Sequence, residues 1–576
     1  MYSKILLALL TATILSCSSS PEVKETQERK WWKEAIVYQI YPRSFKDTDG
    51  DGVGDLKGII EKLDYIKSLG VTAIWLNPIY ESPNYDNGYD VSDYRAISTE
   101  FGTMEDFDLL LSEMHKRDLK LVMDIVVNHS SSEHPWFKAS RSSRDNPYRD
   151  YYHWWPAEKG KPNHRYSLFD AKGEAWAYDS ITNAYYLHYF AKQQPDLNWS
   201  NPKVQEEVIA ILKFWAEKGV DGFRLDAFQF AAKDMSYPEF PEDLDTNFIQ
   251  YYAMQEGIHD YLKLMNSEVF SKYNVMSVAE GAGRNFKEAH ELVDADREEL
   301  SMAYAFDAVD LPKRTDYKLS LLKNIFSKWD QEFSEKGWLS IFLSNHDQAR
   351  LVSRFADDSE PFRTPATKML NTFLLSMRGT PYVYYGDELG MTNIYFDRIS
   401  QYNDIAAING YTKHINQGGD ENVYLEELKQ FSRDNGRTPM QWDNSPQAGF
   451  TSGTPWLSIN ENKSFINVAK EASDEHSILS HFKKMTALRT STPVLTYGDY
   501  QLIDPDHEQI YAFRRFNQED EVVVLLNFSK EVSQIDISEL KEVSAILINN
   551  YDTFTLEKGV AELQAYQGVV LQLKQD

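Results

Sequence analysis

Residues 222–228 read GFRLDAF, and this stretch decides the fold of the chain. Its apolar residues predict a strand that is buried on both faces, as in a parallel sheet. Arg224 and Asp226 nevertheless place two charges near the carboxyl end of that strand. Because a charge removed from water costs several kcal/mol unless it is paired, these residues indicate a functional site rather than a purely structural strand.

The same pattern recurs at the ends of three other predicted strands. DIVVNH occupies residues 124–129, SVAEG residues 277–281 and LSNHDQ residues 343–348. Each motif ends an apolar run with carboxylate, histidine or amide side chains. Such strand ends, met in order along the chain, predict that polar side chains converge on one site.

Eight strands of this kind are predicted, at residues 36–41, 72–77, 121–128, 222–227, 275–280, 303–307, 339–345 and 382–385. Helical stretches separate most of them, and residues 56–69 place apolar side chains on one face before Gly70 ends the helix. This alternation fits an open doubly wound sheet or a closed (β/α)8 barrel. The polar strand ends favour the barrel, because its active site lies at the carboxyl ends of the strands.

The chain is predicted to contain further domains around this barrel. Residues 31–128 and 200–495 form the barrel, and residues 129–199, rich in Trp, Tyr, His and Asp, form a small inserted domain after the third strand. Residues 496–576 alternate short strands with turn residues, which predicts a C-terminal β-sandwich with strands at 510–516, 521–527, 544–548 and 569–573. Residues 386–456 are polar, Gly-rich and aromatic.

Composition excludes several classes of protein. The chain has 576 residues, 42% of them hydrophobic, which is enough for large cores. Lys and Arg number 60 against 88 Asp and Glu, so the net charge of −28 argues against a nucleic-acid partner. A single cysteine excludes an internal disulfide.

That cysteine follows an apolar run of secretory type. Lys4 precedes the run at residues 5–15, and Ser16 and Cys17 follow it. Residues 1–17 resemble a bacterial lipoprotein signal, in which the cysteine is lipidated; an ordinary signal peptide is the alternative. Residues 18–30 are polar and predict a tether. We therefore expect an exported protein, anchored in the cell envelope only through a lipid on Cys17.

The paired carboxylates suit glycoside hydrolysis. That reaction needs one ionised carboxylate to attack the anomeric carbon and one protonated carboxylic acid to protonate the leaving oxygen. Arg224, two residues before Asp226, lies on the same side of its strand and would keep that carboxylate ionised.

From Trp31 to the C-terminus, the chain resembles the α-amylase family of glycoside hydrolases (family 13), in its α-glucosidase and oligo-1,6-glucosidase branch. The resemblance rests on the motifs above, and on QPDLNW at 194–199 and GRTPMQW at 436–442, which are typical of that branch. It implies that Asp226 is the nucleophile, Glu280 the acid/base, and Asp347 the carboxylate that stabilises the transition state.

The resemblance also implies a set of substrate contacts. His129 and His346 would donate hydrogen bonds to the innermost glucose, Tyr89 would stack beneath its ring, and Arg224 belongs to the same set. Asp86 would pair with Arg437 and close the pocket beyond one glucose. For the buried Asp124 we expect an architectural hydrogen-bonding role, and for most aromatic residues at 151–199 a packing role.

A second constellation lies at residues 47–55, which read DTDGDGVGD. Asp47, Asp49, Asp51, the Val53 carbonyl and Asp55 offer oxygen ligands at alternate positions, which suits Ca²⁺. Gly58 stands where an EF-hand would need Glu, so a helix–loop–helix sensor is excluded. The branch carries a matching calcium loop, and we expect a structural role; a solvated acidic turn is the alternative.

We therefore predict a retaining, exo-acting α-glucosidase that acts on short oligosaccharides. The residue after the nucleophile is Ala227, whereas the branch tends to have Val for α-1,6 links and Thr for α-1,4 links. We expect a preference for α-1,4 links, with isomaltose or sucrose as open alternatives. A transglucosylase such as a trehalose synthase, or a sugar-binding relative without activity, would share the fold.

Overall fold

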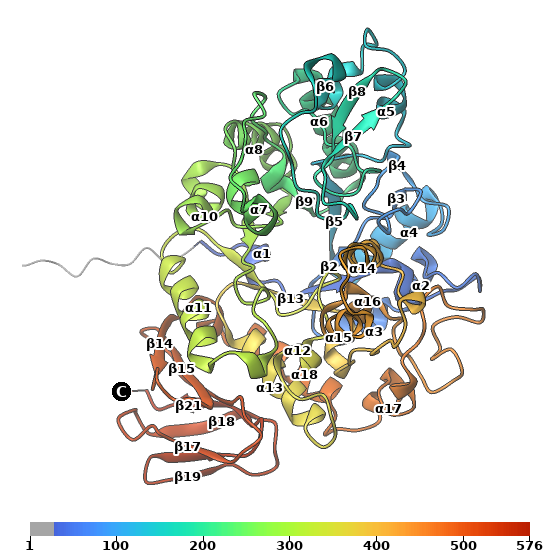
Figure 1. Cartoon of the computed structure of the whole chain (residues 1–576). Helices are drawn as coiled ribbons and strands as arrows, with labels where there is room; N and C mark the ends of the chain where they lie inside the picture. The colour runs from blue at the N-terminus through green and yellow to red at the C-terminus, as the bar shows by residue number, and fades with distance from the viewer. Residues whose placement is uncertain (1–27, 576) are drawn as a thin grey trace, which may run out of the picture.

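Eight parallel strands close into a barrel at the centre of the molecule (Figure 1). The structure is a computed structural model that describes residues 28–575. In spatial order the barrel runs β1-β13-β12-β11-β10-β9-β5-β2. Its strands are β1 (Val37–Ile40), β2 (Ala73–Leu76), β5 (Lys120–Val126), β9 (Gly222–Asp226), β10 (Met276–Ala279), β11 (Met302–Tyr304), β12 (Leu339–Ile341) and β13 (Thr380–Tyr384).

Each of these strands falls within or beside a range predicted from the sequence, and the closed barrel is confirmed over the open sheet. Several predicted strands extend further at their carboxyl ends than the observed ones; β10, for example, ends at Ala279, and Glu280 follows it and lines the pocket at the mouth of the barrel. The helix predicted at 56–69 is divided at Lys62 into α2 (Leu56–Glu61) and α3 (Leu63–Ser68). Gly70 follows with a φ of +81°, a left-handed conformation that favours glycine.

Amphipathic helices surround the barrel and bury their apolar faces against it. They include α4 (Met104–His115), α6 (Pro202–Lys218), α8 (Ile258–Met265), α10 (Phe286–Val293), α11 (Leu319–Glu332), α12 (Leu351–Phe355) and α18 (Ile478–Ser491). α13 (Arg363–Ser376) is buried on nearly all sides, and α7 (Leu244–Tyr252) packs instead on an aromatic cluster with Trp176. Shorter helices are α1 (Trp31–Glu34), α9 (Ser271–Tyr273), α17 (Val468–Ala472) and α19 (Val494–Tyr497).

The region inserted after the third barrel strand, β5, lies above the mouth of the barrel (Figure 1). It begins with α5 (Pro135–Ser140) and holds a three-stranded antiparallel sheet of β6 (Trp154–Pro156), β8 (Ala184–Leu187) and β7 (Trp176–Asp179). A smaller hairpin of β3 (Tyr80–Glu81) and β4 (Asp93–Ile97) follows β2. An aromatic cluster that includes Trp176 and Tyr237 joins the inserted region to the loop after β9.

The polar stretch at 386–456 contains helices that the sequence pattern did not reveal. α14 (Ile405–Asn416), α15 (Glu421–Phe431) and the short α16 (Arg433–Arg437) pack on a small core of Phe396, Tyr402, Leu425 and Leu428. This helical hairpin brings α16 to the edge of the catalytic pocket.

The C-terminal region is a β-sandwich, as predicted. One sheet has the order β14-β15-β16-β21-β18 and the other β17-β20-β19, and Ile510, Val523, Ile535 and Ala561 pack together in a core between them. The strands are β14 (Asp499–Ile503), β15 (Ile510–Phe516), β16 (Glu521–Asn527), β17 (Ser533–Asp536), β18 (Val543–Asn549), β19 (Thr555–Glu557), β20 (Val560–Leu563) and β21 (Gly568–Leu573).

The predicted signal and most of the tether, with Cys17, lie outside the described residues. Within residues 28–575, every helix is too short or too polar to span a bilayer.

Candidate active site

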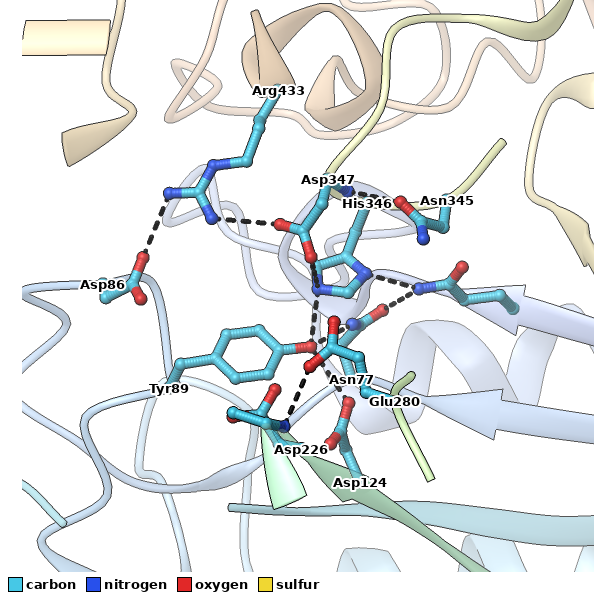
Figure 2. A network of polar contacts seen from close by, with 12 residues as sticks. Asn77, Asp86, Tyr89, Asp124, Asp226, Glu280, Asn345, His346, Asp347 and Arg433 are labelled. Carbon is cyan, nitrogen blue, oxygen red and sulfur yellow. Dashed lines mark hydrogen bonds and ion pairs between the residues drawn. The ribbon is translucent and has the colours of Figure 1, made fainter. Parts of the chain in front are cut away.

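A pocket opens at the carboxyl ends of the barrel strands, and all three acids predicted to be catalytic line it (Figure 2). It contains about 340 Å³ of space. Its walls are Asp226, Ala227, Glu280, His346 and Asp347 from the barrel, Asp86 and Tyr89 from the loop after β2, His129, Phe169 and Phe190 from the inserted region, and Arg433 from α16.

Arg224 holds the two predicted reacting carboxylates together. Its Nη1 atom donates to Asp226 Oδ1 at 2.5 Å, and its Nη2 atom lies 2.7 Å from Glu280 Oε1. Nη1 also binds both oxygens of Asp124, at 2.8 and 3.1 Å. The other Glu280 oxygen accepts the Ala227 N–H at 2.9 Å. One guanidinium group therefore fixes the positions of three carboxylates.

The single positive charge of Arg224 does not balance the three carboxylates around it, and this imbalance affects their pKa values. Burial raises the pKa of Asp226, and the charges of Glu280 and Asp124 raise it further, although Arg224 lowers it. Burial likewise raises the pKa of Asp124 to about 6, against the effect of Arg224. Because one arginine faces three acids, burial and like charge favour a proton within this group of carboxylates. Glycoside hydrolysis by a retaining path likewise uses one protonated and one ionised carboxylate.

The pKa values of Asp347 and His346 are lowered, whereas those of Asp226 and Asp124 are raised. Burial lowers the pKa of His346 to about 4, so its ring is neutral at pH 7. Burial opposes ionisation of Asp347, yet its pKa lies well below the usual range because of neighbouring positive charge. His346 Nε2, 3.0 Å from Asp347 Oδ2, favours the ionised form by a hydrogen bond, and Arg433 and Arg437, each 3.0 Å from Asp347 Oδ1, supply positive charge. Asp347 is therefore a fixed negative charge.

Tyr89 links the two halves of the site (Figure 2). Its hydroxyl donates to Asp124 Oδ2 at 2.9 Å, receives a hydrogen bond from Asn77 at 2.6 Å, and lies 2.7 Å from His346 Nε2. Gln39 donates to the other ring nitrogen of His346 at 2.9 Å, which places the His346 proton on Nε2. The Tyr89 ring stacks on His346 at an interplanar angle of 8° and faces the pocket.

His129 is buried, and burial lowers its pKa to about 3. Its Nε2 atom lies 3.1 Å from the Tyr89 carbonyl oxygen and 3.1 Å from Gln194 Nε2. Gln194 also donates to Asp86 at 3.0 Å. The QPDLNW motif thus connects the inserted region to the pocket wall.

The predicted pairing of Asp86 with Arg437 is wrong. Asp86 pairs with Arg433, whose Nη2 atom lies 3.3 Å from Asp86 Oδ1. Arg437, one helical turn later, donates instead to Asp347 and, at 2.9 Å, to the His346 carbonyl. Arg433 is the one arginine among the described residues that line the pocket. Arg224 and Arg437, predicted as substrate contacts, bind Asp226 and Asp347 from behind and are not part of the lining.

Sequence reasoning also missed the residues that support Arg433. Asp404 accepts hydrogen bonds from Arg433 Nε at 3.0 Å and Nη2 at 2.5 Å. The Phe169 ring lies 4.7 Å from the Arg433 guanidinium, and its carbonyl accepts from Asn409 on α14 at 2.6 Å. Phe169 and Phe190 belong to residues 151–199, where we expected a packing role for most of the aromatic side chains, and both line the pocket. The sequence did offer one signal for Arg433: it is a positively charged residue just before the GRTPMQW motif at 436–442.

The acidic loop at 47–55 brings together three carboxylates. Ligand atoms of Asp47, Asp49 and Asp55 all lie within 4.8 Å of one another, so they could hold a metal ion. Gly50 and Gly52, with φ of +86° and +97°, allow the tight wrap. Asp51, also predicted as a ligand, stands outside this group and accepts the Val53 N–H at 2.7 Å. The donor set of hard oxygens fits a cation such as Ca²⁺.

Comparison with known proteins agrees with this geometry. Residues 39–498 match the alpha amylase catalytic domain, and residues 500–570 match the maltogenic amylase C-terminal domain. The chain is 48% identical over 545 residues to the oligo-1,6-glucosidase of Parageobacillus thermoglucosidasius, covering 92% of this chain and 96% of that protein. It is 44% identical over 514 residues to the trehalose-6-phosphate hydrolase of Bacillus subtilis, covering 88% and 91%.

Among solved structures, the trehalulose synthase of Pseudomonas mesoacidophila superposes with a TM-score of 0.92 at 42% identity, covering 95% of this chain and all of that one. The likeness therefore extends over both the barrel and the C-terminal sandwich. With the acids of glycoside chemistry in one pocket and with similarity along nearly the whole chain, the protein belongs to the alpha-amylase family and is a glycoside hydrolase.

Proposed function

We propose that the protein is an exo-acting α-glucosidase that removes terminal α-1,6-linked glucose from short oligosaccharides. The observation that carries this proposal is the bridge from Arg224 to Asp226 and Glu280, inside a pocket that Asp86 and Arg433 close on one side.

Hydrolysis would proceed in two steps. Asp226 Oδ attacks the anomeric carbon of the terminal glucose, and Glu280 gives its proton to the glycosidic oxygen as that bond breaks. Glu280, now ionised, then takes a proton from water, which attacks the same carbon and releases Asp226. Two inversions retain the anomeric configuration. The closeness of both carboxylates to one guanidinium supports this retaining path.

The pocket wall supports removal of single units. Arg433 joins Asp86, Asp347 and Asp404, and Phe169 covers its guanidinium. A glucose placed against Asp226 and Asp347 would meet this wall at its non-reducing end, so the chain could extend only toward the mouth. An endo-acting enzyme needs space on both sides.

The linkage preference follows the relatives rather than the expected α-1,4 preference. The relative from P. thermoglucosidasius is named an oligo-1,6-glucosidase, as is a Bacillus cereus protein that is 45% identical over 563 residues. Initial rates on isomaltose, maltose, sucrose and trehalose, with the released anomer identified by NMR, test the proposal. We expect isomaltose to be hydrolysed fastest, with α-glucose released; faster hydrolysis of maltose, or release of the β-anomer, would contradict it.

The same assay distinguishes hydrolysis from the two alternative functions, transglucosylation and sugar binding without activity. A transglucosylase, like the trehalulose synthase that shares this fold, would convert sucrose or maltose into an isomer with little free glucose. A sugar-binding relative without activity would lack one of Asp226, Glu280 and Asp347, whereas all three line the pocket.

We also propose that the cation held by Asp47, Asp49 and Asp55 is Ca²⁺ and that its role is structural. Asp47 is buried, and the loop lies against Thr451, whose hydroxyl donates to Asp47. A cation would thus join the loop after β1 to the segment after α16, away from the reacting acids.

Export and lipid anchoring remain a proposal that rests on residues 1–30 alone. Metabolic labelling with palmitate in a bacterial host tests it: we expect label in the full chain and none in Cys17→Ser. Equal labelling of both would remove the anchor.

A further inference from the structure

A second cluster of buried charges lies at the opposite end of the barrel from the catalytic pocket. Here α11 packs beside β14 and β15 of the C-terminal sandwich (Figure 1). Arg378 lies two residues before β13, Arg515 on β15, Arg489 on α18 and Asp330 on α11. All four side chains are buried.

This cluster has more positive than negative charge. Asp330 is bound on both oxygens, by Arg378 Nε at 3.2 Å and by Arg515 Nη1. Arg489 neighbours Arg515 and donates to the backbone carbonyls of residues 375, 377 and 379. At the edge, the negative charge of Asp499 raises the pKa of Arg378, and Lys33 adds a positive charge near Arg378. Three buried arginines thus face one buried carboxylate.

Several donors of these arginines are unused. Within residues 28–575, Arg378 Nη1, Arg515 Nε and Nη2, and Arg489 Nε are buried and have no hydrogen-bond partner. A buried charged donor without a partner is costly, so native proteins supply one. Water would satisfy the hydrogen bonds but not the charge. Burial and the charge of Arg515 lower the pKa of Arg489 to about 9, which agrees with excess positive charge in this region.

A small cavity adjoins the cluster. Arg378 and Asp330 line it together with Phe326, Trp329, Phe333 and Trp338. Because both Asp330 oxygens are already bound to arginines, the unpaired charge that the cavity presents is that of the Arg378 guanidinium. Aromatic walls exclude bulk water and would strengthen the attraction for an anion.

We infer that the arginine cluster binds a small monoanion of halide size, which joins the base of the barrel to the C-terminal sandwich. The anion would lie in this cavity against Arg378 Nη1, with Arg515 and Arg489 adding positive charge from behind its wall. It would balance buried charge that Asp330 leaves unpaired, and would therefore stabilise the fold without taking part in catalysis.

Thermal unfolding of the full chain tests this inference. At matched sodium concentration, we expect sodium chloride and bromide to raise the Tm by a few degrees over sodium gluconate, saturably, because an anion that binds only the native state stabilises it. Arg378→Gln should lose the halide dependence. Arg165→Gln is the matched control, because Arg165 is a buried arginine that donates to the carbonyls of His164 and Pro238, far from the cluster.

A second measurement does not depend on the folding of a variant. Crystals of the unmodified protein soaked in bromide should show an anomalous peak within hydrogen-bond distance of Arg378 or Arg515. Ordered water there instead of bromide, or a Tm that responds equally to gluconate and halide, would overturn the inference. Unchanged halide dependence in Arg378→Gln would also overturn it.

Discussion

Arg433 Nη1 lies 3.0 Å from Asp347 Oδ1, although the two residues come from different elements, α16 and the end of the β12 segment. The same guanidinium binds Asp86 at 3.3 Å (Figure 2). One side chain therefore joins the acid predicted to stabilise the transition state to the wall that limits the pocket. Contacts to glucose and pocket length are coupled through this residue.

Arg433→Ala should open the wall and weaken binding of the terminal glucose. Loss of one charge-assisted hydrogen bond, worth about 1.5–3 kcal/mol, predicts a fall in kcat/KM on isomaltose of about 10- to 100-fold, mostly through KM. Steady-state kinetics measure it. Arg514→Ala, at a paired arginine of the C-terminal sandwich, is the control and should leave both constants unchanged. An unchanged KM in Arg433→Ala would remove Arg433 from the substrate site.

Asp404 is expected to act through Arg433. It binds Arg433 and also caps α14, accepting the Ala406 N–H at 3.2 Å. Asp404→Asn retains a good helix cap but loses the charge, so KM on isomaltose should rise about 3- to 10-fold with little change in kcat or Tm. Asp420→Asn, the corresponding cap of α15, is the matched control. If both variants behave alike, Asp404 has only a capping role.

The barrel could be predicted because buried parallel strands produce near-continuous apolar runs, as in residues 121–127. The hairpin of α14 and α15 could not. α14 contains Gly410 and several β-branched and Asn residues, which are weak helix formers, and its stability comes from packing on Tyr402 and Leu425. Tertiary contacts of this kind are not visible in a local pattern.

In the site, too, some residues could be predicted from the sequence and others depend on tertiary contacts. Asp226, Glu280 and Asp347 could be predicted because each ends a recognisable strand. The partner of Asp86 could not, because Arg433 and Arg437 are four residues apart on one helix and share a face. Only the position of α16 decides which of the two arginines enters the pocket.

Substrates with different leaving groups distinguish the predicted roles of Asp226 and Glu280. Glu280→Gln should lower kcat/KM on isomaltose by about 10²–10⁴-fold, because the leaving oxygen then departs without a proton. On α-glucosyl fluoride, which needs little protonation to leave, the first step should remain near the unmodified rate. Asp226→Asn should be inactive on both substrates. Retained activity of Asp226→Asn on the fluoride would contradict its assignment as nucleophile.

Chelation should lower the Tm more than it lowers the rate of molecules that are still folded. Ca²⁺ bound only to the native loop stabilises it by mass action. Asp49→Asn should lose this response, since Asp49 is an exposed member of the carboxylate group and can change with little effect on packing. Asp51→Asn, outside the group, should keep it. Differential scanning fluorimetry with EDTA and added Ca²⁺ measures both, and equal responses would argue against the site.

The pH profile of kcat/KM should be bell-shaped, with both limbs belonging to the Asp226–Glu280 pair. The rate rises with pH as the nucleophile loses its proton and falls as the acid loses its own. Asp347 and His346 should set neither limb, because the pKa of Asp347 lies far below the usual range and burial lowers the pKa of His346 to about 4.

Asp124→Asn tests the assignment of both limbs to Asp226 and Glu280, because it predicts the direction in which the limbs move. It removes one negative charge from Arg224, so the remaining two acids hold their proton less tightly and both limbs should move to lower pH, by about 0.5 to 1 pH unit. Asp387→Asn is the control, since burial raises the pKa of that carboxyl to about 7 but it binds Ser344 rather than Arg224. Limbs that stay in place in Asp124→Asn, or that move equally in Asp387→Asn, would show that charge shared on Arg224 does not govern the reacting pair.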